Sequence, residues 1–303
     1  MSPLLLIVLA ASPTTPEIAK EAVIVQSPPA WELASEGHLA LSLQRLGMLA
    51  DLKLRAKRKL YLSDSEFLAD NSLTLALTAQ VSPVFAHAGA QVDFQPASFL
   101  KLSGGYHFVG YFGAMGRLRQ PTNCENLNTL TASETRCDFH PIYFEHVDEG
   151  VPASGHRFWL EAQVMGRVGP VIAVGSVRGE QWLMNSPGQY WVNELYGISQ
   201  TRSDTVISGG GALLYAVLDA EGRRPELLVG VADELAWSLG PNSFFNRVGP
   251  VAMLRAPKWG AWRDVSAQLA VLFYTHERYM VGTPFLALAF SAATPDLLTR
   301  AER

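Results

Sequence analysis

Four basic side chains recur at every second position of one short stretch: Lys53, Arg55, Lys57 and Lys59. The positions between them are mostly apolar, and a period of two is typical of a β-strand with unlike faces. If the apolar face meets lipid, the basic face cannot, because each Lys or Arg near the bilayer midplane costs about 2–4 kcal/mol. The basic row is therefore expected to line the lumen of a barrel.

Other alternating stretches carry acidic side chains on their polar side that could neutralise this row: Asp93, Glu161, Glu180 and Asp264. On the stretch 157–168, Glu161 and Arg167 share the polar side, so both are candidates for the lumen. An electropositive lumen would favour the passage of anions. A lumen filled with ion pairs would instead make a closed barrel, and the sequence leaves both alternatives open.

The two cysteines, Cys124 and Cys137, lie in the longest stretch without a period, residues 113–155. One pair within a single loop of an exported chain predicts a disulfide that closes that loop. His140 and His146 lie nearby, but no CxxC or HxxxH spacing is present. The sequence therefore predicts neither a metal site nor a cofactor.

Residue types that could support catalysis occur close together at two places, but without a diagnostic motif. Ser154 lies near His156, and Thr275 precedes His276. Proximity alone does not make a nucleophile and base, and no GxSxG turn is present. We expect no enzyme, with an outer-membrane lipid hydrolase as the weakest of the alternatives.

The composition favours a chain that crosses a membrane with strands. Hydrophobic residues make up 48% of the 303 residues, charged residues 17%, and the mean hydropathy is +0.10. No window approaches the roughly 18 continuous apolar residues of a spanning helix. Many candidate strands of about ten residues favour a membrane β-barrel over a soluble β-sandwich or lipocalin-like barrel. The net charge of -4 and a pI near 6.0 argue against a nucleic-acid partner.

The expected organisation starts with a signal peptide over residues 1–11, where the apolar run lacks a preceding basic residue. A proline-containing periplasmic lead-in over 12–37, a barrel over 38–293 with an external loop at 113–155, and a polar tail over 294–303 follow. Both ends of such a barrel lie in the periplasm, so the strand number should be even. Counting 38–48 as the first strand and 171–196 as one protruding strand gives about twelve strands, with ten as the alternative.

The alternating strands, the turn at Phe94-Gln95-Pro96 with Leu100 and Leu102 after it, and a last strand containing Gly282 and Phe285 resemble bacterial outer-membrane β-barrel proteins. The resemblance implies an all-β, antiparallel, up-and-down transmembrane barrel in the bacterial outer membrane. It also implies contact with outer-membrane lipid and with the barrel-assembly machinery. Such proteins usually end on an aromatic residue, whereas here Phe290 is followed by a polar tail.

Two functions remain at this point. In the first, the protein is a porin-like pore or transporter for small anionic solutes, lined by the basic row. In the second, it is a closed barrel that displays the Cys124–Cys137 loop for binding or for envelope structure.

Overall fold

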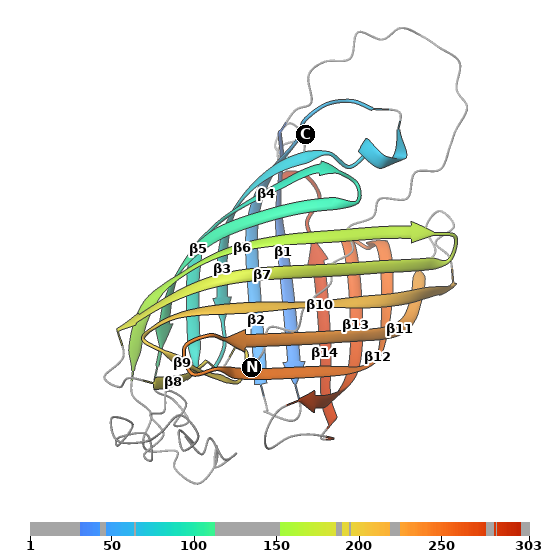
Figure 1. The fold of residues 1–303 in the computed structure, drawn as a ribbon. Coiled ribbons are helices and arrows are strands. Elements are labelled where there is room, and N and C mark those ends of the chain that lie inside the picture. The colour runs from blue at the N-terminus through green and yellow to red at the C-terminus, as the bar shows by residue number, and fades with distance from the viewer. Residues whose placement is uncertain are drawn as a thin grey trace, which may run out of the picture.

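Twelve antiparallel strands form a closed β-barrel in the computed structural model (Figure 1). The structure describes residues 31–42, 47–63, 65–112, 152–185, 190–193, 195–218, 225–276, 282 and 284–297. The fold class and the count of twelve strands predicted from the sequence are confirmed. Among the described residues, no helix has the length and apolar character needed to cross a membrane.

The barrel strands are β1 (Trp31–Ser42), β2 (Gly47–Lys59), β3 (Ser72–Val81), β4 (Phe85–Ala97), β5 (Leu100–Tyr111), β6 (Ala153–Val168), β7 (Val171–Asn185), β10 (Ser203–Leu218), β11 (Glu226–Ser238), β12 (Ser243–Trp259), β13 (Trp262–His276) and β14 (Pro284–Ala293). Each pairs with the next along the barrel, and β1 closes the cylinder against β14. Outside the cylinder's order are the short 3-10 helix η1 (Glu66–Leu68) and a two-stranded sheet of β8 (Tyr190–Asn193) and β9 (Ile198–Thr201).

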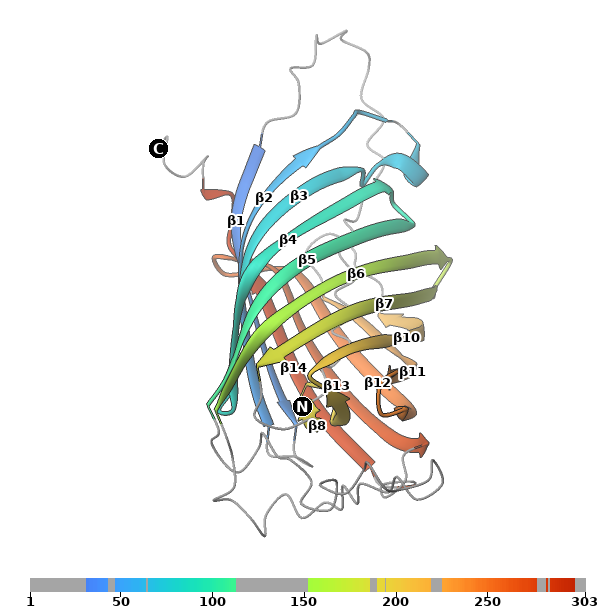
Figure 2. The same ribbon diagram turned by 60° about the vertical axis from the view of Figure 1, so that its left-hand side comes forward.

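The two ends of the barrel differ. One end carries η1, and the opposite end carries β8 and β9, as both views show (Figures 1 and 2). We call these the η1 end and the hairpin end. Tight turns join strands at the η1 end, such as the turn at Gly169, whose φ of 57° suits a glycine. The longest stretch between barrel strands, residues 112–152, joins β5 to β6 at the hairpin end.

The outer face is a continuous apolar surface. Large apolar side chains are exposed at alternate positions around the cylinder, among them Leu52, Leu77, Leu160, Val177, Leu213, Val231 and Leu269. Exposed aromatic residues lie toward both ends: Trp31, Trp259 and Trp262 at the η1 end, and Tyr106, Phe108, Phe158 and Trp237 toward the hairpin end. An apolar band with aromatic rims is the outer surface expected of a barrel in a lipid bilayer.

The interior is divided into two unlike halves. Inward side chains of β10 to β14 are largely apolar and buried, among them Leu214, Leu228, Phe245, Val251, Leu272 and Phe285. Inward side chains of β1 to β6 are mostly polar or charged. The apolar half packs as a core, so the open part of the lumen lies against the β1–β7 wall.

Three predicted boundaries differ from the structure. β1 begins at Trp31 rather than at residue 38, because its pairing with β2 continues to Trp31, opposite Arg58. Within this added part, Glu36 points inward and reaches Arg55 at 3.2 Å. The charged side chain of Glu36 on the inward face interrupts the apolar alternation of this strand. β6 begins at Ala153, so the predicted loop 113–155 ends before residue 153 rather than at residue 155.

The third correction concerns the stretch 171–196, which is not one protruding strand. β7 ends at Asn185, and the chain folds back to form β8 and β9. The reason is burial: Trp191 and Tyr196 retain 1% and 2% of their exposure, whereas a protruding strand would leave them in water. The predicted signal peptide, Cys124 and Cys137 lie outside the described residues.

Candidate lumen site

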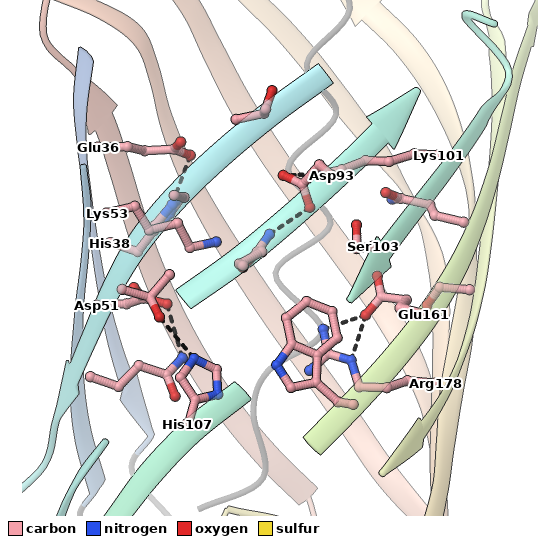
Figure 3. Close-up of a pocket in the computed structure, with 18 of the residues that line it drawn as sticks. Glu36, His38, Asp51, Lys53, Asp93, Lys101, Ser103, His107, Glu161 and Arg178 are labelled. Carbon is pink, nitrogen blue, oxygen red and sulfur yellow. Dashed lines mark hydrogen bonds and ion pairs between the residues drawn. The ribbon is translucent and has the colours of Figure 1, made fainter. Parts of the chain in front are cut away.

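A polar cavity of about 280 Å³ opens along the β1–β7 wall (Figure 3). Its cationic lining side chains are Lys53, Arg55, Lys57, Lys101, Arg157 and Arg178. Its anionic lining side chains are Glu36, Asp51, Asp93, Glu161 and Glu234. The alternation of the strands brings these groups together, because inward positions of β1 to β7 face the same space, and Glu234 of β11 faces it from across the barrel.

Most lining cations are neutralised by an acid on a neighbouring strand. Arg55 meets Glu36 at 3.2 Å, and Lys101 meets Asp93 at 3.3 Å. Arg178 forms an ion pair with Glu161 across the β6–β7 pair. These contacts correspond to the ion-paired lumen that was one of the two alternatives from the sequence.

Lys53 and Lys57 differ from these neighbours, since the structure shows no ion pair for either among the residues it describes. Lys53 projects from β2 toward the middle of the cavity (Figure 3). The cavity therefore contains ion pairs together with two cations whose charge is not cancelled by a direct partner.

The remaining residues predicted to line the lumen lie elsewhere. Lys59 is the last residue of β2, at the η1 end, and does not line the cavity. Arg167 lies near the end of β6, where its guanidinium meets Glu226 at 2.9 Å and the Gly169 carbonyl oxygen at 3.1 Å. Of the six predicted lumen residues, Lys53, Arg55, Lys57 and Glu161 line the cavity.

A buried charge network connects the wall to the hairpin. Arg157 Nε donates to Glu180 at 3.0 Å, and Trp182 Nε1 donates to the same carboxylate at 2.7 Å. The Tyr196 hydroxyl, from the segment between β8 and β9, also donates to Glu180. Sequence reasoning did not select Arg157, although its parity with Glu161 on the same strand would have placed it on the inward face.

The β8–β9 hairpin lies within the mouth of the barrel. The Trp191 ring contacts Tyr111 of β5 and Trp182 of β7, with ring centroids 5.5 and 5.6 Å apart. β9 also packs against β11 and β12. Asp204 ties the end of the hairpin to the wall by accepting from Thr201 N at 3.0 Å and from Ser238 Oγ at 2.6 Å. The hairpin thus reaches from β5 to β12 and narrows this end of the lumen.

Trp159 forms the aromatic part of the cavity wall. Its ring stacks on His107 with centroids 6.3 Å apart, and the Arg178 guanidinium lies 4.6 Å from the ring centroid. Gly105 on the adjacent strand leaves room for this ring. A Cβ at Gly105 would lie 2.8 Å from the Ala90 carbonyl oxygen and 2.8 Å from two atoms of the Trp159 ring.

Gly105→Ala is therefore expected to destabilise the barrel by about 1–3 kcal/mol, the usual cost of overpacking. Gly179→Ala is the matched control, because a Cβ at Gly179 meets no atom within 4 Å. Urea titration of the purified protein in detergent, read by the mobility difference between folded and unfolded forms on gels, compares the two variants. Equal unfolding midpoints would contradict the expectation.

The catalytic candidates have other contacts. His156 faces outward, where its Nδ1 lies 2.8 Å from the Tyr106 hydroxyl and its ring stacks on Tyr106. His276 packs against Phe244 with ring centroids 5.1 Å apart and the ring planes tilted by 56°. Within the described ranges, no group of three or more His, Cys, Asp or Glu residues is placed to hold a metal ion.

No protein-family model and no curated protein matches the chain. Solved structures with a similar fold include the KdgM porin, with 8% identity, a TM-score of 0.38, and coverage of 86% of this chain and 98% of that chain. The NanC porin has 5% identity, a TM-score of 0.42, and coverage of 87% and 100%. The β domain of the Bordetella autotransporter BrkA has 10% identity, a TM-score of 0.42, and coverage of 89% and 100%. The likeness concerns the barrel fold alone.

Proposed function

We propose that the protein is a channel of the bacterial outer membrane that admits small solutes and prefers anions. The membrane location is supported by the apolar outer surface with aromatic rims, which in water would be a large surface for aggregation. In this location the tight turns of the η1 end face the periplasm and the hairpin end faces outward. The outer face would contact lipid, and the barrel-assembly machinery would insert the chain.

The preference for anions rests on one observation: within the part of the chain that the structure describes, Lys53 and Lys57 line the polar cavity without ion pairs, among neighbours that have them. Unpaired cations in a confined, low-dielectric passage raise the local concentration of anions. Because most other lining charges are neutralised in pairs, and the lining acid Asp51 also has no ion pair among the described residues, we expect a moderate preference rather than strict exclusion of cations.

Replacing Lys53 with Gln is expected to lower the anion-to-cation permeability ratio roughly fivefold. At a dielectric constant near that of water, a unit charge about 8 Å from a passing ion attracts an anion and repels a cation by ~0.5 kcal/mol each, and the two effects together change the ratio by ~1 kcal/mol. The measurement is the reversal potential of the purified barrel in planar lipid bilayers under a salt gradient. Lys258→Gln removes the same charge from an exposed position at the η1 end and should leave the ratio unchanged.

A reversal potential that Lys53→Gln leaves unchanged would remove the basis for anion preference. Absence of conductance in the unmodified protein would favour the second candidate, a closed barrel that serves binding or envelope structure. Two observations support that candidate: the apolar half of the interior, and the hairpin in the mouth. In that case the loop with Cys124 and Cys137 would be the part displayed for binding.

A further inference from the structure

Three inward side chains lie side by side on β1, β2 and β3: His38, Asp51 and Gln80. Asp51 is the register partner of His38 on one side and of Gln80 on the other. All three line the cavity. Among the residues that the structure describes, each also has one buried side-chain atom without a hydrogen-bond partner: His38 Nδ1, Asp51 Oδ1 and Gln80 Oε1.

All three of these atoms are hydrogen-bond acceptors. Gln80 Nε2 donates to Asp51 Oδ2 at 2.9 Å, which leaves the amide oxygen of Gln80 unused. His38 Nε2 lies 2.8 Å from Glu36 Oε1, so in the neutral ring Nδ1 is the acceptor. Buried acceptors without donors are unfavourable, so a donor group that reached this row from the cavity would bind favourably.

The charges beside this row are also uncompensated. Asp51 has no ion pair among the described residues, and neither does Lys53, two positions further along the same face of β2. Water could satisfy the acceptors, but it would leave both charges without a counterion. A polyanion would be repelled by the carboxylates of Glu36 and Asp93, which line the same cavity. A molecule with one cationic donor group and one carboxylate matches both charges.

We propose that this part of the lumen binds zwitterionic solutes of the α-amino acid type. The ammonium group is bound by Asp51, Gln80 and His38, and the carboxylate by Lys53. Figure 3 shows His38, Asp51 and Lys53 on the same side of the cavity. The cavity of about 280 Å³ is at the lower limit of ligand pockets, which suits one small molecule rather than a polymer. This site names a substrate class for the proposed channel. Passage of the solute rests on the proposed function, but its binding does not.

The test is calorimetric titration of the detergent-solubilised full chain with L-alanine and with L-lactate, which has a hydroxyl in place of the ammonium. We expect alanine to bind at least tenfold more tightly than lactate. Asp51→Asn and Lys53→Gln should each weaken alanine binding at least tenfold, whereas Lys258→Gln should not change it. Gel mobility before and after heating shows that each variant is folded.

Equal binding of lactate and alanine, or no binding of alanine to the folded protein, would overturn the proposal. The comparison of the two ligands needs no variant, so a variant that fails to fold does not weaken it. Conductance without either solute tests the channel separately. An anion-selective channel that does not bind alanine would refute this inference alone, and alanine binding by a barrel without conductance would refute the channel alone.

Discussion

Removal of the β8–β9 hairpin is expected to increase single-channel conductance several-fold. The change is replacement of residues 190–201 with a short Gly-Ser linker. Such a linker can join β7 to β10, since Leu183 and Ser203 are already register partners. The hairpin reaches from β5 to β12 inside the mouth, so its removal widens the narrow part of the passage. Single-channel recording in planar bilayers measures the effect.

Tyr196→Phe is the conservative counterpart of this deletion. It keeps the hairpin but removes the hydroxyl that binds Glu180 and lies 3.3 Å from Ser208 Oγ. We expect the open-channel conductance of this variant to stay near that of the unmodified protein, with more frequent opening. If the deletion variant folds and its conductance is unchanged, the hairpin does not control the passage. The apolar packing of β10–β14 would then be what limits the width of the passage.

The part of the site that could be predicted from sequence is the part encoded by strand alternation. Side chains at every second position must share one face, and charge costs too much on the lipid face. These two facts suffice to direct Lys53, Arg55 and Lys57 inward. The same reasoning applies to Glu161 on a strand far along the chain, and all four line one cavity.

Two features could not be predicted in this way. The strands β10 to β14 carry apolar residues on both faces, as at Leu213 and Leu214, so alternation gives no contrast between lipid and lumen. The hairpin has no period that distinguishes a loop inside the barrel from one outside it. Its position depends on contacts between distant residues, such as Trp191 with Tyr111, that spacing along the chain does not reveal.

Glu180→Ala is expected to destabilise the barrel by about 3–5 kcal/mol, the usual cost of leaving a buried charge without its partner. The side chains of Arg157 and Glu180 retain 2% and 0% of their exposure, so water cannot replace the lost carboxylate. The same change also removes the acceptor of Trp182 Nε1 and of the Tyr196 hydroxyl. The urea midpoint of the purified protein in detergent measures the loss.

Glu161→Ala is the comparison, because its partner Arg178 keeps 25% of its side-chain exposure and also lies 3.7 Å from Glu180. Water in the cavity can hydrate that guanidinium, so we expect a clearly smaller loss. Arg157→Met combined with Glu180→Leu should recover much of the stability lost in Glu180→Ala, since no charge is then left buried. If Glu161→Ala destabilises the barrel as much as Glu180→Ala, water does not enter the cavity, and a passage for solutes along this wall is excluded.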